Sequence, residues 1–185
     1  MDLACFGDAG DGERTAFLPD CGYDWGILLD KPRSISPWER DVTRRLRLET
    51  SSLPGRRLHL AIVAQRYIQL ILRDVKTVEA RLSVTRQPPF GRVDRGDVIA
   101  MKRVSGPIVA IGIASRVWSY ELEQGDLLRI EKEFGDRVAA DATFWRRRTT
   151  LGYATLIELT DVRPIVPIAC RKRDQRAWVV LTTKP

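Results

Sequence analysis

The chain has 185 residues, of which 44% are hydrophobic and 30% charged, and its formal net charge is +7. This balance suits one globular domain with an extension, and enough apolar residues are present to build a buried core. The longest apolar run, residues 107–114, is far shorter than the roughly 20 residues that a membrane-spanning helix needs. The first residues also lack the basic and apolar segments of a secretory signal. We therefore expect a cytoplasmic protein without membrane association.

The charge is unevenly distributed along the chain. Residues 1–30 contain seven acidic residues and one basic residue, whereas residues 31–57 contain eight basic and three acidic ones. The remaining part, residues 58–185, contains 22 basic and 14 acidic residues. A basic balance of this kind favours a polyanionic partner, RNA or DNA, and the alternative is a soluble protein that is merely basic.

Cysteine and histidine are too few and too scattered for a metal site. The three cysteines, Cys5, Cys21 and Cys170, show no metal-binding spacing, and His59 is the only histidine. His59 lies in an alternating apolar run, so we expect a structural strand residue rather than a ligand or a base. The sequence also lacks a phosphate-binding glycine loop and the common hydrolase motifs. We expect neither a metal nor another cofactor.

The first 57 residues are predicted to form an N-terminal extension. Residues 1–30 are rich in glycine and aspartate, which is typical of an irregular acidic arm, although several aromatic residues suggest that part of it packs onto the domain. Ser36 and Glu39 flank Pro37 as in a capping box, which predicts a helix over about 36–50. A linker follows it.

Residues 58–185 are predicted to form the main domain, because helical and alternating patterns follow one another there. A face of small residues, Ala110, Gly112 and Ala114, suggests close approach by either another backbone, as in tight closure of the barrel against a helix, or a ligand. We expect a helix over 121–148, broken at Gly135. The predicted strands are 58–62, 78–82, 98–103, 109–114 with an extension toward 118, 153–162 and 177–182, and the other predicted helix is 65–74. The fold class is therefore α+β, a small, partly closed β-barrel of about six strands with flanking helices.

The most informative segment lies between the helix at 65–74 and the strand that follows. Alternation places Thr77, Glu79 and Arg81 on one face of that strand, with Lys76 at its start. Ionisable groups gathered at a helix-to-strand junction indicate a ligand site, and the alternative is a salt bridge at a strand end.

The spacing Lys76-x-x-Glu79-x-Arg81 resembles the signature of the ASCH domain family, a branch of the PUA-like superfamily. Thr77 fits the hydroxyl residue that often follows the lysine, whereas Asp74 stands where the family usually has glycine. The resemblance covers residues 58–185 and implies a PUA-like β-barrel, in agreement with the pattern of elements.

The resemblance implies an RNA-binding protein. In this interpretation Lys76 and Arg81 neutralise phosphates in a basic cleft, and Glu79 either accepts a hydrogen bond from a base or holds Arg81. The segment Phe144–Arg148 combines aromatic and cationic residues that can stack on bases and hold phosphates. Its predicted nucleic-acid contacts are Trp145, Arg146, Arg147 and Arg148. The alternative is an ordinary helix end.

The resemblance also implies a hydrolase, since one branch resembles amidohydrolases of acetylated cytidine and ribonuclease activity is ascribed to the family. Lys76, Thr77 and Glu79 would then be catalytic. That branch places a nucleophilic threonine two residues before the motif arginine, where this chain has Glu79, so its mechanism does not transfer directly. A third alternative is a protein-interaction domain. The acidic arm would either moderate nucleic-acid binding or cover another part of the domain.

Overall fold

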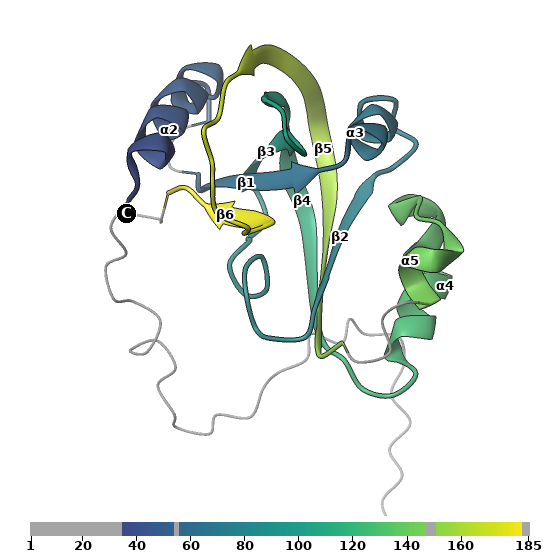
Figure 1. The fold of residues 1–185 in the computed structure, drawn as a ribbon. Helices are drawn as coiled ribbons and strands as arrows, with labels where there is room; N and C mark the ends of the chain where they lie inside the picture. The colour runs from purple at the N-terminus through teal and green to yellow at the C-terminus, as the bar shows by residue number, and fades with distance from the viewer. Residues whose placement is uncertain (1–34, 54–55, 147–150, 183–185) are drawn as a thin grey trace, which may run out of the picture. The chain divides into compact units, whose positions relative to one another are not determined.

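The structure, a computed structural model, describes residues 35–53, 56–146 and 151–182. The acidic arm lies outside the described residues. The unit Ile35–Pro185 is built on a six-stranded mixed sheet with the order β2-β5-β4-β3-β1-β6 (Figure 1). The strands are β1 Leu58–Val63, β2 Val78–Ser83, β3 Val98–Arg103, β4 Ile108–Glu121, β5 Tyr153–Ile168 and β6 Trp178–Val180. The helices are α2 Pro37–Glu49, α3 Gln65–Leu72, α4 Asp126–Val138 and α5 Ala142–Arg146.

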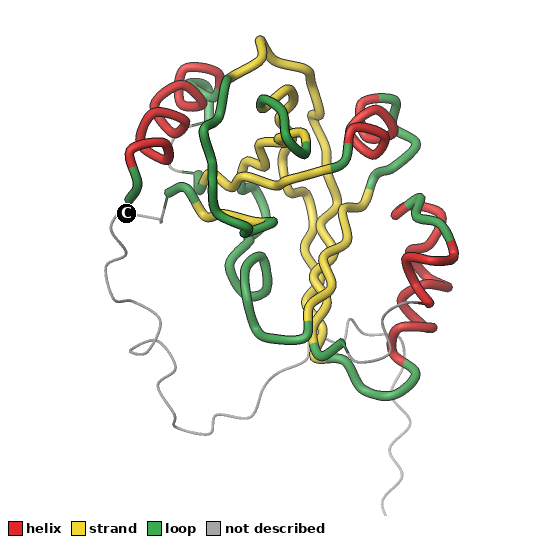
Figure 2. Tube along the Cα trace, viewed as in Figure 1, coloured by secondary structure: helices red, strands yellow, loops and turns green. Residues whose placement is uncertain are grey.

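The sheet curls into a half-barrel. β1 and β3 are parallel, while the other neighbouring strands are antiparallel. The two longest strands, β4 and β5, run together through the sheet (Figure 2). Their register shifts at three places. Such bulges bend and twist paired strands, which curls the sheet. In the described residues, β2 and β6 are the two edges of this half-barrel. The predicted α+β class, a small, partly closed barrel of six strands with flanking helices, is confirmed.

The helix near the N-terminus belongs to the same packed unit as the sheet. Ser36 caps α2, and the carboxylate of Glu39 accepts hydrogen bonds from the main-chain N–H and the hydroxyl of Ser36. Val42 and Leu46 are almost fully buried against residues of β1, β3 and β6. The compact unit thus begins at Ile35, before the boundary predicted at residue 57.

Two predicted features differ from the structure around residues 115–139. The strand β4 continues to Glu121, because residues 116–121 pair with β5, so the helix α4 begins only at Asp126. The helix also passes through Gly135 without a break and ends at Val138. Ala139, with φ of +48°, ends it in the left-handed conformation.

The face of small residues on β4 is explained by close packing. A Cβ at Gly112 would lie 3.0 Å from the Val162 side chain and 3.5 Å from the Thr160 carbonyl oxygen, both on β5. Ala110 and Ala114 are fully buried in the core. The neighbouring strand, rather than a ligand, therefore approaches this face.

No helix among the described residues is long and apolar enough to cross a bilayer. The same residues contain no group of three or more histidine, cysteine, aspartate or glutamate side chains that could hold a metal ion.

Candidate functional site

The junction between α3 and β2 is a tight turn that places Lys76 beneath the end of α4. The amides of Val75 and Lys76 donate hydrogen bonds to the carbonyl of Leu70. Asp74 has φ of +59°, in the left-handed region that glycine adopts freely and aspartate tolerates better than most residues. This conformation accounts physically for the glycine that the signature usually has at this position.

Lys76, Glu79 and Arg81 form one ion cluster, in which the carboxylate bridges two cations. Lys76 Nζ lies 3.3 Å from Glu79 Oε2, and Arg81 Nη2 lies 2.9 Å from Glu79 Oε1. Lys76 and Glu79 are only 4% and 7% exposed. The structure thus brings together the three charged residues of the predicted motif.

The three N–H groups of Lys76 have three acceptors at hand. Besides Glu79, Nζ donates to the carbonyl oxygens of Val78, at 2.7 Å, and of Val138, at 2.8 Å. Burial lowers the pKa of Lys76 below 10.5; Glu79 opposes this shift and Arg81 adds to it. With its donors occupied and its side chain buried, Lys76 is not placed to neutralise a phosphate.

Arg81 ties the two edges of the half-barrel together. From β2, its guanidinium donates to the carbonyl of Ile62 at the end of β1, at 2.9 Å, and to that of Ala177 before β6, at 3.4 Å. It also lies over the Trp178 ring, 5.3 Å from its centroid. We call the gap between β2 and the β1–β6 edge of the half-barrel the seam. At this point the Arg81 side chain, instead of main-chain hydrogen bonds between strands, joins its two sides.

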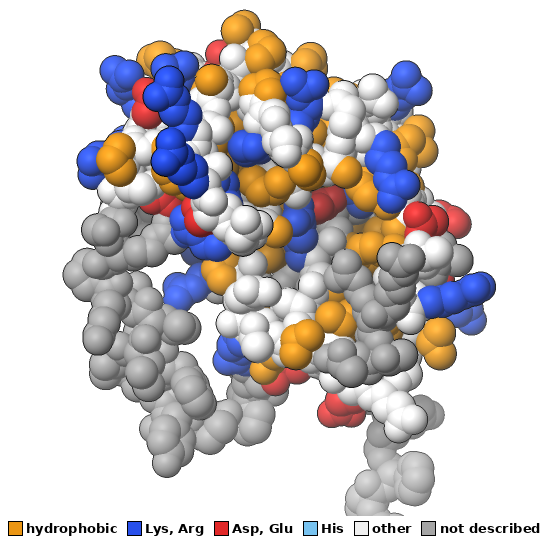
Figure 3. Space-filling model, viewed as in Figure 1, with side chains coloured by type: hydrophobic (Ala, Val, Ile, Leu, Met, Phe, Trp, Pro, Cys, Tyr) orange, Lys and Arg blue, Asp and Glu red, His pale blue; other side chains and the backbone are white. Residues whose placement is uncertain are grey.

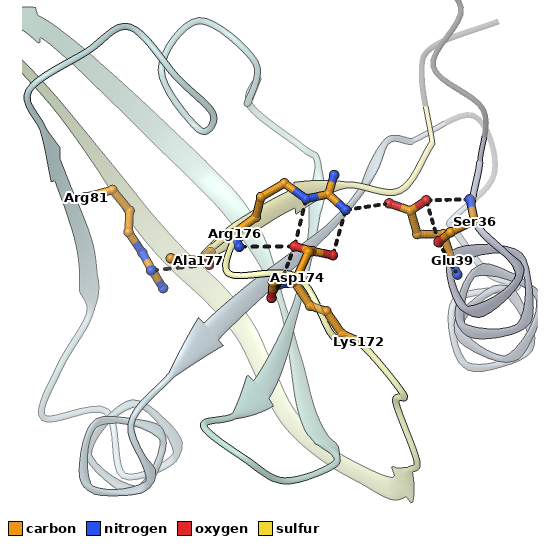
Figure 4. A network of polar contacts seen from close by, with 7 residues as sticks. All are labelled: Ser36, Glu39, Arg81, Lys172, Asp174, Arg176 and Ala177. Carbon is orange, nitrogen blue, oxygen red and sulfur yellow. Dashed lines mark hydrogen bonds and ion pairs between the residues drawn. The ribbon is translucent and has the colours of Figure 1, made fainter.

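The wall of the seam at Ala177 is held by a second polar network, which Figure 4 shows together with Arg81. Arg176 Nε lies 2.8 Å from Asp174 Oδ1, and Arg176 Nη2 lies 3.2 Å from Glu39 Oε1. Glu39 is 1% exposed and is the same carboxylate that caps α2. The network joins the segment before β6 to the start of that helix.

A cavity of about 760 Å³ opens at the seam. Its volume falls in the range typical of small-molecule sites. Glu79 and Arg81 line it, as do Tyr67, Phe144, Thr155 and Trp178, whereas Lys76 and Thr77 are not among the lining residues. The other charged residues that line it, Arg66 and Asp141, face each other at 3.6 Å. Because these charges are paired, the structure does not show the predicted basic cleft.

The other predicted site residues that the structure describes do not line the cavity. The Thr77 hydroxyl accepts a hydrogen bond from Arg137 Nε at 3.4 Å. Trp145 is 5% exposed and packs in the core beside α4 and β2, so its ring is not free to stack on a base. Arg146 is exposed, and Arg147 and Arg148 lie outside the described residues. The neighbouring Phe144 lines the cavity in place of Trp145.

The cavity wall also depends on residues that sequence reasoning did not single out for the site. Trp178 Nε1 donates to His59 Nδ1 at 3.2 Å, and His59 Nε2 lies 3.0 Å from Asp97 Oδ2. Since tryptophan only donates, Nδ1 carries no proton in this arrangement, and Nε2–H donates to Asp97. His59 is a buried strand residue, as predicted, and it fixes the Trp178 ring. His59 and Trp178 are 119 residues apart in the sequence, and no sequence pattern predicts their contact.

The carboxylate of Asp97, which accepts the hydrogen bond from His59, has a lowered pKa. Burial would raise the pKa of Asp97, but the hydrogen bonds from His59 and the Asp94 amide, with the charge of Arg57, lower it overall. Asp97 therefore remains an acceptor that holds the Nε2–H tautomer of His59.

Known structures share this fold. The ASCH protein of Zymomonas mobilis is 15% identical, with a TM-score of 0.55, over 68% of this chain and 87% of that one. Two single-residue variants of it give TM-scores of 0.56 and 0.55, at 15% and 18% identity, covering 70% and 71% of this chain and 93% and 92% of theirs. No protein-family model and no curated protein matches the sequence. The chain has an ASCH-like fold.

Proposed function

We propose that this chain is a nucleic-acid-binding module, with RNA as its partner, that holds an unpaired base in the seam cavity. The observation that carries the proposal is the cavity itself, which the half-buried rings of Tyr67 and Phe144 line together with Glu79. Aromatic rings stack on bases, and a carboxylate accepts hydrogen bonds from base amino and imino groups.

The basic side chains of the surface are better suited to binding phosphates than the residues that line the cavity. The cations at the cavity are compensated by Glu79 and Asp141. Residues 58–185 nevertheless have eight more basic than acidic residues. Figure 3 shows Lys and Arg side chains spread over the visible face, with several over α2, where Arg40, Arg44 and Arg47 are exposed. Backbone affinity from this surface would be strongly salt-dependent.

The test is binding of single-stranded RNA, followed by fluorescence anisotropy over a range of salt concentrations. Roughly five phosphate contacts give a slope of about −3.5 in log K against log salt. Tyr67→Ala should weaken binding about fivefold or more, the cost of losing one stacked base. Tyr120→Ala, a matched change of a half-buried tyrosine that does not line the cavity, should leave affinity unchanged. Absence of binding at low salt would refute the proposal and favour a protein-interaction domain.

A hydrolase acting on a nucleoside or RNA is the second candidate. It is favoured by the Glu79 carboxylate, which lines the cavity and could act as a base toward water, beside a lysine whose pKa is lowered. The arrangement does not support Thr77 as a nucleophile, since its hydroxyl faces Arg137. Incubation with acetylated cytidine and with RNA, followed by chromatography, tests it: a product that Glu79→Gln fails to form supports the hydrolase.

A further inference from the structure

The outer edge of β2 faces the seam, and its main-chain groups can be followed one by one. Val78 lies opposite Glu158, and the Leu159 amide donates to the Thr77 carbonyl at 2.9 Å. This pattern makes Val78–Glu158 a pair without mutual hydrogen bonds. Glu79 and Arg81 then exchange hydrogen bonds with β5. The N–H and C=O groups of Val78, Ala80 and Leu82 point the other way, into the seam.

Of these three outward-facing residues, two have partners. The Val78 carbonyl accepts from Lys76 Nζ, and Leu82 also has an interaction partner. No hydrogen bond joins the outward N–H or C=O of Ala80 to any residue that the structure describes. Ala80 is 9% exposed and lines the cavity. Buried main-chain groups are nearly always paired, so this donor and acceptor are available to a partner that enters the cavity.

A second buried donor lies on the adjacent residue. The Nε of Arg81 has no hydrogen-bond partner among the described residues, although its other two nitrogens hold the seam closed. Arg81 also lines the cavity. Two neighbouring positions of β2 thus leave polar groups unsatisfied at the same cavity.

We propose that the main chain of Ala80 reads the edge of the ligand that occupies this cavity. The N–H and C=O of one extended residue point in the same direction, side by side. They match a planar group that carries an acceptor next to a donor, as the Watson–Crick edge of an unpaired nucleobase does. The inference rests on the proposed function and specifies its contact: the lactam or amidine edge of a base pairs with Ala80 while the ring lies among Tyr67 and Phe144.

The free edge is too short for an extended peptide. Adding a strand to a sheet needs several consecutive outward-facing residues, because main-chain hydrogen bonds supply the affinity. Here the Val78 carbonyl is engaged by Lys76 on one side, and Leu82 has an interaction partner of its own on the other. Arg81 also crosses the seam to Ile62 and Ala177. Among these residues Ala80 keeps both a donor and an acceptor, side by side, which suits a single flat heterocycle.

The side chain at this position leaves the edge accessible. The Ala80 methyl group packs with Val78, Ile130 and Phe134 in the core cluster beside α4. Recognition by the main chain places no demand on the side chain beyond small size. A residue of this kind carries no sequence signal of a binding site.

The experiment compares short oligouridylate with the same oligomer methylated at N3 of each base, and oligoadenylate with its N6,N6-dimethyl form. Each methylation removes the donor that faces the Ala80 carbonyl. We expect about a tenfold or larger loss of affinity for the methylated form of whichever oligomer binds. The 2′-O-methyl oligomer, altered away from the base edge, should bind as the parent does. On titration with the parent, the backbone amide resonance of Ala80 should shift downfield in a ¹⁵N–¹H spectrum.

The outcomes separate this inference from the proposed function. Equal binding of methylated and parent oligomers, with the salt dependence intact, overturns the role of Ala80 and leaves RNA binding standing. No binding of any oligomer overturns both. An Ala80 resonance that responds only to an extended peptide would overturn both in favour of strand addition. Ala80→Pro removes the outward N–H without touching the β5 ladder, and an edge strand accepts proline there. If folded, it should lose affinity for the parent by a similar factor.

Discussion

Replacing Lys76 by methionine should destabilise the protein more than the same replacement of an exposed lysine. The methionine fills most of the lysine's volume, so the change removes chiefly the ammonium group. Two carbonyls, those of Val78 and Val138, lose the donor that satisfies them at 2.7 and 2.8 Å. Glu79 retains Arg81 at 2.9 Å, so the carboxylate keeps a partner.

The size of the effect follows from these contacts. Each buried acceptor that loses its donor costs about 1–3 kcal/mol, while removing a buried ammonium recovers part of its desolvation cost. We expect a net loss of about 2–4 kcal/mol in the free energy of unfolding, measured by urea denaturation followed by circular dichroism. Lys132→Met, on the exposed surface of α4, is the matched control and should stay within about 0.5 kcal/mol of the parent.

The pH dependence supplies an independent check. The folded protein holds the pKa of Lys76 below its value of 10.5 in the unfolded chain. Between the lowered pKa and 10.5 the unfolded chain binds more protons, so the contribution of Lys76 to stability rises with pH there. The difference in unfolding free energy between the parent and Lys76→Met should widen across that window. Equal midpoints and equal m values for the two proteins at neutral pH would refute the reasoning.

Two further predictions concern the helix α4 and the buried carboxylate of Asp97. Gly135→Ala should raise the unfolding free energy by about 0.5–1 kcal/mol, because a Cβ there meets only Glu131 Cγ at 3.9 Å, and a lower urea midpoint would contradict it. The pKa of Asp97 is lowered in the folded state, so the stability that Asp97 contributes is present above 3.8 and lost as the pH falls through the lower folded value. The advantage of the parent over Asp97→Asn should thus shrink in acid unfolding series; an advantage unchanged below pH 3.8 would show that the charge is not its source.

The sequence predicted the structure correctly wherever a single local pattern determines it. Alternation located the strands, and the capping box at Ser36 and Glu39 located α2. Alternation predicted that Glu79 and Arg81 face the same way, because side chains two apart on a strand share a face. Lys76 precedes the strand, so its contact with Glu79 does not follow from alternation.

Features that depend on competition between effects were not predictable from the sequence. Gly135 costs its helix only about 1 kcal/mol, and the buried stripe of Ile130, Phe134 and Val138 outweighs that cost. In a helix as short as α5, the pattern does not show which of Phe144 and Trp145 turns inward. The sequence predicted Lys76 in a cleft, where it would neutralise a phosphate or act in catalysis. In the structure its ammonium group donates to two main-chain carbonyls, which no pattern of residue types reveals.

The carboxylate of Glu39 sets a limit on how far the chain can be shortened. It caps α2 through Ser36 and at the same time holds Arg176, one residue before the Ala177 carbonyl that receives Arg81. Trimming the chain to the region that resembles the ASCH signature would remove this anchor along with Val42 and Leu46. We therefore expect a stable shortened form to start at or before Ser36, because the first turn of α2 holds a part of the cavity wall that lies 137 residues later in the chain.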